Sequence, residues 1–175
     1  KINSIYFDSI YFKDFYNASE GIYSRSKKRV RWYNNTFNTD IHPTLEIKIK
    51  KGNQNFKLNH QLNSFKVGNL FIIKNFKNYI NIFKLNNQNI NFVLGNLNMY
   101  LYVTYIRKYY KFKNIRITLD YNLSFLNLSR LFKFSNKNLN KRINTSILEI
   151  KFEDNNYIDA NIFAKLMNKK IDKFS

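Results

Sequence analysis

The sequence contains no cysteine, a single proline and four glycines among its 175 residues. Without cysteine the chain cannot form disulfides, thiolate metal sites or cysteine nucleophiles, and this suits a reducing compartment. The scarcity of glycine and proline excludes a collagen-like or loop-dominated architecture. The sequence also lacks a run of about 18 predominantly apolar residues, so it offers no candidate transmembrane helix.

Acidic residues are scarce as well. The chain has 11 Asp and Glu against 30 Lys and Arg, which gives a formal net charge of +19. So large an excess indicates a polyanionic partner, which is nucleic acid, anionic lipid or phosphate chains. Compositional drift would instead scatter surface lysines without a pattern, so the positions of the charges have to decide.

Apolar and polar residues alternate with period 2 along most of the chain, as is typical of β-strands. The strands that this pattern predicts are Asn3–Phe7, Ile22–Tyr33, Thr44–Lys51, Asn55–Leu58, Tyr79–Leu85, Met99–Tyr110, Asn114–Asp120 and Ser146–Glu153. Helical patterns are fewer, at Ile10–Asn17, His60–Lys66 and Ile158–Lys169, and connections are expected at Asn34–Pro43, Asn86–Asn91 and Ser129–Asn144. We therefore expect one mainly β (α+β) domain, a sandwich or a barrel.

Several of these strands carry one apolar and one charged face, because residues two apart share a face. The charged face of the second strand carries Arg25, Lys27, Arg29, Arg31 and Tyr33, opposite Val30 and Trp32, and only Lys28 interrupts the second face. The tetrapeptide Leu-Glu-Ile-Lys occurs at 45–48 and again at 148–151, each time with the carboxylate beside cations. An ordinary solvated sheet would show such faces too. The preference for arginine favours phosphate recognition, and a carboxylate among cations suits a Mg²⁺ or Mn²⁺ ligand beside phosphates.

Several segments, in order, resemble the polyphosphate polymerase domain of the vacuolar transporter chaperone (VTC) type, within the triphosphate tunnel metalloenzymes. They are Ser4-Ile5-Tyr6-Phe7-Asp8, Gly21 through Tyr33 with its Arg-x-Lys-x-Arg-x-Arg-Trp-Tyr pattern, Leu45-Glu46-Ile47-Lys48 with Lys57, Tyr105-Ile106-Arg107 with Ile115 through Asp120, and Leu148-Glu149-Ile150-Lys151. The resemblance covers nearly the whole chain.

The resemblance implies a closed antiparallel eight-stranded tunnel β-barrel with a basic lumen and a few helices outside it. It also implies ATP as phosphate donor, inorganic polyphosphate as product, Mn²⁺ or Mg²⁺ as cofactor, and no specific nucleic acid partner. A cytoplasmic location follows, or one at the cytoplasmic face of a membrane beside a membrane-bound partner. The residues implied to bind phosphate are Arg29, Arg31, Lys48, Lys57, Tyr105, Arg107, Arg116 and Lys173, with Glu149 as metal ligand. Of these, Arg29, Arg31, Lys48, Arg107 and Arg116 are the expected ATP contacts.

Two departures from the family pattern concern the ends of the sequence. The family's opening strand has no counterpart before Lys1. Near the C-terminus the family has a Ser-Lys pair, whose role we expect Lys173 or a residue after Ser175 to fill. We therefore expect residues 1–175 to form a single catalytic domain that lacks its first strand and its extreme C-terminus.

Other functions are compatible with the same residues. A tunnel triphosphatase acting on RNA 5′ ends, thiamine triphosphate or short polyphosphate would share the cationic lumen, and a non-catalytic barrel could bind polyphosphate as an accessory subunit. Plain RNA binding through surface charge predicts steep salt dependence. His42 and His60 fall in or beside expected loops, so we interpret them as incidental.

Overall fold

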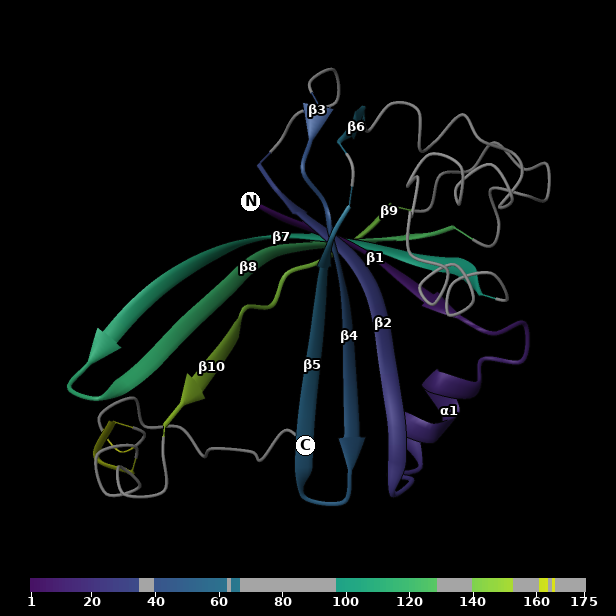
Figure 1. Ribbon diagram of the computed structural model, residues 1–175. Coiled ribbons are helices and arrows are strands. Elements are labelled where there is room, and N and C mark those ends of the chain that lie inside the picture. The colour runs from purple at the N-terminus through teal and green to yellow at the C-terminus, as the bar shows by residue number, and fades with distance from the viewer. Residues whose placement is uncertain are drawn as a thin grey trace. The chain divides into compact units, whose positions relative to one another are not determined.

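The computed structural model (Figure 1) describes residues 1–34, 40–62, 64–66, 97–128, 140–152, 161–163 and 165. Its elements are β1 (Ile2–Asp8), α1 (Lys13–Ser19), β2 (Ser24–Tyr33), β3 (Asp40–Ile41), β4 (Thr44–Lys51), β5 (Gln54–Gln61), β6 (Phe65–Lys66), β7 (Asn98–Phe112), β8 (Ile115–Asn127), β9 (Asn140–Ile143) and β10 (Ile147–Lys151). The protein is thus mainly β, as the sequence predicts. No helix in the described ranges is both long enough and apolar enough to cross a membrane.

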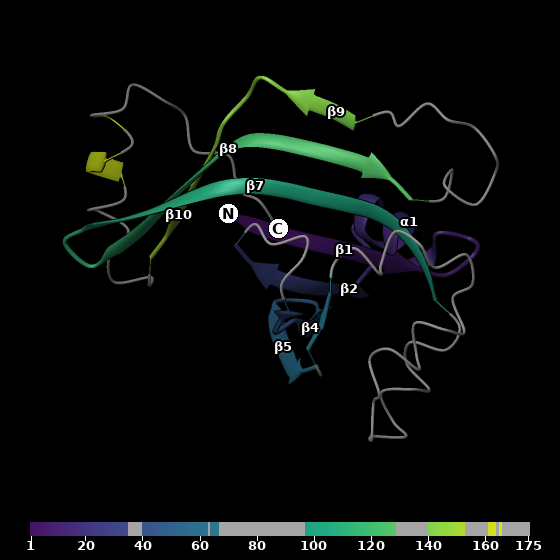
Figure 2. The same cartoon turned by 90° about the horizontal axis from the view of Figure 1, so that it is seen from above.

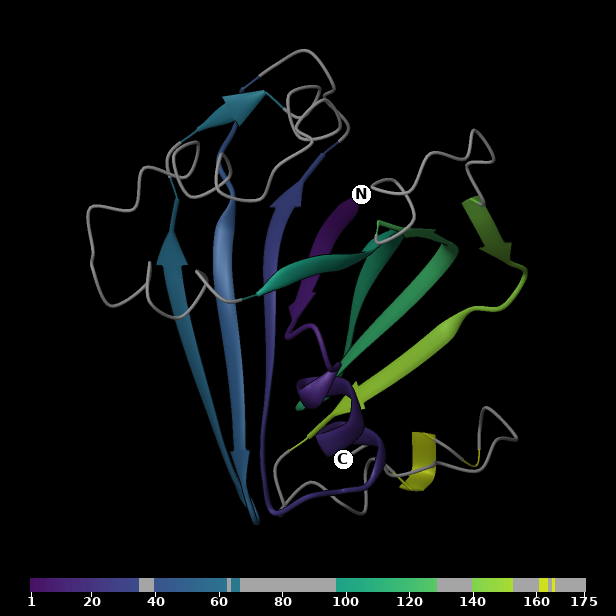
Figure 3. The same ribbon diagram turned by 90° about the vertical axis from the view of Figure 1, so that its right-hand side faces the viewer.

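One eight-stranded sheet has the order β10-β8-β7-β1-β2-β4-β5, with β9 paired to β8, and β3 and β6 form a separate two-stranded sheet. The registers of β1 with β2, β2 with β4, β4 with β5, and β10 with β8 are antiparallel. Figure 2 shows β7, β8 and β9 as neighbours, and β2, β4 and β5 run side by side in Figure 3. Within the described ranges, β10 and β5 stand at the two ends of this order.

The chain divides into two compact units. Unit 1 comprises residues 1–104 and 124–142, and unit 2 comprises residues 105–123 and 143–175.

The core of unit 1 lies on one face of β1, β2 and β4. The register pairs Ile5 with Val30 and Val30 with Leu45, so these side chains form a row across three strands. Trp32 is 2% exposed and stacks on Tyr102, with ring centroids 5.9 Å apart. Because side chains alternate along each strand, burying this row forces the arginines of β2 onto the opposite face.

Asp8 of β1 and Asp14 of α1 attach helix α1 to the rest of unit 1. Asp8, at the end of β1, accepts hydrogen bonds from the backbone N–H groups of Asp14 (2.9 Å) and Phe15 (2.9 Å), which satisfies donors that the first helical turn leaves unpaired. Asp14 in turn accepts hydrogen bonds from Ser26 (2.9 Å) and Lys28 (2.5 Å). Lys28, which interrupts the apolar face of β2, is therefore the ion-pair partner of α1.

Unit 2 is built on the turn between β7 and β8 and on β10. Lys113 has a φ of 50° at this turn. Ile115 and Ile117 are buried on one face of β8, and Ile150 and Phe152 pack against them. The register pairs Glu149 with Thr118 on the other face. Ile150 of the second Leu-Glu-Ile-Lys segment thus packs on the core, while Leu148 of the same segment is 37% exposed.

The strand predictions at the described positions are confirmed, with bounds shifted by up to three residues, except that β8 continues to Asn127, beyond the predicted end at Asp120. The predicted helix at His60–Lys66 is wrong, since β5 continues through Gln61 and β6 occupies Phe65–Lys66. Strand pairing with β4 overrides the short helical pattern at His60 and Gln61. The expected connection at Asn34–Pro43 contains the short strand β3, and the one at Ser129–Asn144 contains β9. The predictions at Tyr79–Leu85 and Asn86–Asn91 lie outside the described residues, and the helix at Ile158–Lys169 is described only at 161–163 and 165, where the chain is helical.

Candidate functional site

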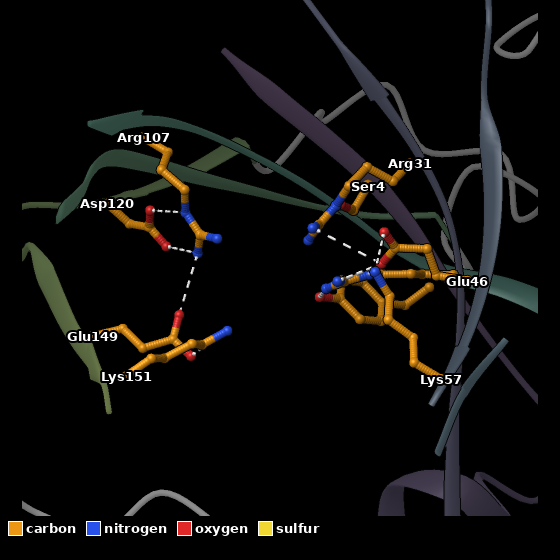
Figure 4. Close-up of polar contacts among 10 residues, drawn as sticks. Ser4, Arg31, Glu46, Lys57, Arg107, Asp120, Glu149 and Lys151 are labelled. Carbon is orange, nitrogen blue, oxygen red and sulfur yellow. Dashed lines mark hydrogen bonds and ion pairs between the residues drawn. The ribbon is translucent and has the colours of Figure 1, made fainter. Parts of the chain in front are cut away.

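The polar face of unit 1 gathers cations around one carboxylate. The register places Arg29 opposite both Tyr6 and Glu46, and Arg31 opposite Ser4. Lys57 of β5 reaches the same carboxylate from the other side of β4. We call Ser4, Tyr6, Arg29, Arg31, Glu46 and Lys57 the Glu46 cluster, and Figure 4 shows Arg31 and Lys57 pointing toward the Glu46 carboxylate.

The contacts in the Glu46 cluster are short and specific. Arg29 donates from Nε to Glu46 Oε2 (2.7 Å), and its Nη2 lies 2.5 Å from the same oxygen. Nη1 of Arg29 donates to the Tyr6 hydroxyl (3.0 Å), and Lys57 Nζ donates to Glu46 Oε1 (3.1 Å). Arg31 donates from Nε to Ser4 Oγ (3.2 Å), and its Nη1 lies 3.9 Å from Glu46 Oε2. Three cations therefore share one anion, which leaves an excess of positive charge on this face.

Burial and charge act against each other in the cluster. Burial by itself would raise the pKa of Glu46, but Arg29, Arg31 and Lys57 outweigh it and hold that pKa below its ordinary value. Burial likewise opposes the charged form of Arg29, yet Tyr6 and Glu46 leave its pKa raised. Both partners of the pair are therefore ionised around neutral pH.

Unit 2 carries a second set of charges, the Arg107 cluster, which comprises Tyr105, Arg107, Thr118, Asp120, Glu149 and Lys151. Arg107 donates from Nε and Nη2 to the two Asp120 oxygens, at 2.6 Å each, and its guanidinium lies 5.4 Å from the Tyr105 ring centre. Figure 4 also shows Glu149 beside Arg107 and Lys151, with nitrogen–oxygen distances of 3.8 Å and 3.3 Å. The hydrogen bonds from Arg107 to Asp120 are the main reason that the pKa of Arg107 is raised.

The carboxylates of the two Leu-Glu-Ile-Lys segments differ in their access to solvent. The Glu46 side chain is 6% exposed and the Glu149 side chain is 43% exposed. Within the described ranges, no three His, Asp or Glu residues group so as to hold a metal by themselves. Mg²⁺ and similar hard cations are commonly bound by one or two carboxylates together with substrate phosphates. Glu149 fits that mode and Glu46 does not, since Arg29 and Lys57 occupy its oxygens.

The structure brings most of the sequence-predicted site residues into these two clusters. Arg29, Arg31 and Lys57 lie in the Glu46 cluster, and Tyr105, Arg107 and Glu149 lie in the Arg107 cluster. Lys48 is exposed and pairs in register with Lys27 and Lys57, while Arg116 is exposed opposite Lys151. Lys173 lies outside the described residues.

Sequence reasoning assigned no site role to Tyr6 or Asp120, and it described Glu46 only as one of two metal-like carboxylates. Alternation already placed Glu46 and Asp120 on the charged faces. The missing signal was the cross-strand register, which puts each carboxylate beside one particular arginine.

Both the sequence and the fold of this chain are similar to those of known proteins. The family described as the VTC domain matches residues 1–175, which is the whole chain. A solved structure from Bacillus halodurans, a protein provisionally described as an adenylate cyclase, shares the fold with a TM-score of 0.56 and 10% sequence identity over 99% of this chain and 78% of that one. No curated protein matches the chain.

Proposed function

Because the chain belongs to the VTC domain family, we propose that it is a polyphosphate polymerase that transfers the γ-phosphate of ATP to a growing inorganic polyphosphate chain. The observation that carries this proposal is the pair of charge clusters, in which arginines are held by buried carboxylates and surrounded by further cations. Such an arrangement suits a linear polyanion, because arginine binds phosphate oxygens through paired donors and lysine contributes a point charge.

Phosphoryl transfer requires little covalent chemistry from the protein. It requires the reacting phosphates in line and their charge neutralised. In the proposed reaction, Arg29, Arg31, Arg107 and Arg116 bind non-bridging oxygens, and Tyr105 donates a hydrogen bond to a phosphate. Lys48, Lys57 and Lys173 add positive charge along the path. The attacking group is the terminal phosphate of the growing chain, which is already an anion, so no side-chain base is needed.

Glu149 is the residue proposed to hold a divalent cation, Mn²⁺ or Mg²⁺. Its carboxylate is half exposed and lies beside Lys151 and Arg107, where a phosphate would supply the remaining oxygen ligands. When bound there, the cation would neutralise charge that develops on the transferred phosphoryl group. Asp120 is not proposed as a ligand, because both its oxygens accept hydrogen bonds from Arg107.

We further propose that the sheet closes into an eight-stranded tunnel with the polar faces of its strands inside. Support comes from the alternation itself, since the apolar rows pack in the two cores and the charged rows lie opposite them. Closure also gives an edge strand a partner, which sheets commonly require.

The test is incubation of the purified chain with ATP and Mn²⁺, with and without a short polyphosphate primer. The expected products are ADP and long chains visible on a gel stained for polyphosphate. ADP and free phosphate without chains would identify a triphosphatase instead, and tight polyphosphate binding without turnover would identify an accessory binding protein.

Glu149→Gln separates metal use from anion binding. We expect this variant to bind tripolyphosphate within about threefold of wild type, because the cations are untouched, and to lose turnover. Glu20→Gln, which removes an exposed carboxylate beyond α1, is the matched control and should retain both properties. Unchanged turnover in Glu149→Gln would contradict the metal assignment.

A further inference from the structure

The two clusters hold their central arginines in the same way. Glu46 contacts Arg29 through Nε and Nη2, and Asp120 contacts Arg107 through the same pair of nitrogens. In both cases the carboxylate lies against the edge of the guanidinium formed by Nε and Nη2, and Nε is the nitrogen nearest to the backbone of the arginine. The far end, which carries Nη1 and the outer N–H of Nη2, is turned away from the carboxylate.

Counting donors shows what remains at that far end. A guanidinium has five N–H groups. Arg29 uses one on Nε and one on Nη2 for Glu46, and one on Nη1 for the Tyr6 hydroxyl, so among the residues that the structure describes two remain without an acceptor, one on each terminal nitrogen. Arg107 uses one on Nε and one on Nη2 for Asp120, and its Nη2 also lies 3.8 Å from Glu149 Oε2. Within the described part of the chain, neither N–H of Nη1 has a hydrogen-bond acceptor. Each arginine therefore keeps at least two donors, the number that paired binding of a phosphate requires.

The two carboxylates are themselves covered. The side chains of Glu46 and Asp120 are 6% and 10% exposed, against 43% for Glu149. Their oxygens are already occupied by Arg29, Lys57 and Arg107. A metal could replace these contacts only by releasing buried cations from their counter-ion, which is costly.

We propose that Glu46 and Asp120 are a matched pair of positioning residues, each of which fixes one arginine so that its terminal N–H groups meet the oxygens of a phosphate. This inference rests on the proposed function and deepens it, since it assigns the carboxylates of the two clusters to different tasks. Glu149 serves the metal, and Glu46 and Asp120 serve the arginines. Holding the guanidinium in place before the substrate binds spares the cost of ordering it during the reaction.

The proposal predicts opposite effects on binding and on turnover. Glu46→Gln and Asp120→Asn each remove a negative charge, so attraction of a polyanion should be equal or stronger. The amide holds the arginine less firmly, so turnover should fall by about 10- to 100-fold, the range seen when partners that orient functional groups are removed. The Mn²⁺ concentration needed for half-maximal activity should not change.

The experiment measures tripolyphosphate affinity by calorimetry, kcat and KM for ATP, the Mn²⁺ requirement, and the melting temperature for both variants. Asp14→Asn is the matched control, because it breaks a carboxylate–lysine pair in which both side chains are only 16% exposed, and this pair lies beside α1, outside both clusters. It should lower stability without changing kcat or affinity. Using one variant in each unit keeps the test valid if either fails to fold.

A second measurement does not depend on turnover. In a ¹H–¹⁵N spectrum, the Nε–H signals of Arg29 and Arg107 should exchange slowly with solvent in the wild type and rapidly in Glu46→Gln and Asp120→Asn respectively. Slow exchange in the variants, an unchanged kcat, or a raised Mn²⁺ requirement would each overturn the inference. If the wild type extends no chains, the polymerase proposal fails, while the exchange measurement still decides the positioning role.

Discussion

Glu46 is the hub of its cluster, and Arg29 is only one of its partners. This asymmetry predicts that Glu46→Ala destabilises the protein more than Arg29→Met does. Glu46 contacts Arg29, Arg31 and Lys57. Arg29 contacts Glu46 and the Tyr6 hydroxyl. Removing the hub leaves several cations without a counter-ion, whereas removing Arg29 leaves Glu46 still paired.

The structure sets the magnitude of each loss. Breaking a buried ion pair by removing one partner typically costs about 3–5 kcal/mol. The side chains of Arg29 and Arg31 are 13% and 9% exposed, so the loss of their counter-ion carries this cost for both. The Lys57 side chain is 45% exposed and stays solvated without Glu46, so its contribution is small. Arg29 and Arg31 keep their hydroxyl partners, so we expect about 3 kcal/mol for Glu46→Ala. For Arg29→Met we expect about 1–2 kcal/mol, the loss of one set of charge-assisted hydrogen bonds.

The assay is urea unfolding at neutral pH, followed by circular dichroism, in a buffer free of phosphate. The double variant, Glu46→Ala with Arg29→Met, completes a cycle that measures the coupling between the two residues. We expect a double variant less destabilised than the sum of the single ones. Equal losses for the two single variants, or simple additivity, would refute the description of Glu46 as a hub.

Two further predictions concern stability. Because the pKa of Glu46 is lowered, its carboxylate stabilises the fold fully above its ordinary value of 4.5, and this contribution is lost as the pH falls through the folded value. The difference in unfolding free energy between wild type and Glu46→Gln should thus be constant near neutrality and shrink below pH 4.5, and a difference that grows in acid would contradict the assigned charge. Gly52 has a φ of +56°, and an added Cβ would lie 2.7 Å from Tyr23 Cε2, so Gly52→Ala should cost about 1–2 kcal/mol in thermal unfolding. Gly52→Asn, which tolerates this backbone conformation better, should cost less, and equal losses would show that crowding rather than φ dominates.

The fold was largely predictable because its strands alternate strictly. In β4 the apolar residues alternate with charged ones, so only one orientation of the strand buries the apolar row; the apolar residues are Leu45, Ile47 and Ile49, and the charged ones are Glu46, Lys48 and Lys50. The bounds of β4 match the predicted ones. The helix at His60–Lys66 was mispredicted because local periodicity over a few residues is weak beside eight register pairs between β4 and β5. Very short strands such as β3 and β9 have too few residues to show a period at all.

The candidate site was predictable in some of its cations, but not in the carboxylates that hold them. Alternation and resemblance together pointed to Arg29, Arg31 and Arg107, since arginines in a lysine-rich chain are conspicuous. Alternation and charge alone do not distinguish Glu46 from Glu149, which occupy the same tetrapeptide, and only the family resemblance singles out Glu149 as a metal ligand. Their difference lies in exposure and in cross-strand neighbours, which only the folded sheet supplies. The same holds for Asp120, whose pairing with Arg107 joins two different strands.

Trp32 gives unit 1 a fluorescence signal of its own. It is the chain's only tryptophan, it is buried in the core of unit 1 against Tyr102, and it directly follows Arg31 on β2. Its fluorescence therefore reports on unit 1, with the blue-shifted emission of an indole shielded from water, while unit 2 is silent at the same wavelength. Circular dichroism reports on both. A spectroscopist who follows the two signals in one titration can thus tell, without introducing any label, which unit loses its structure first.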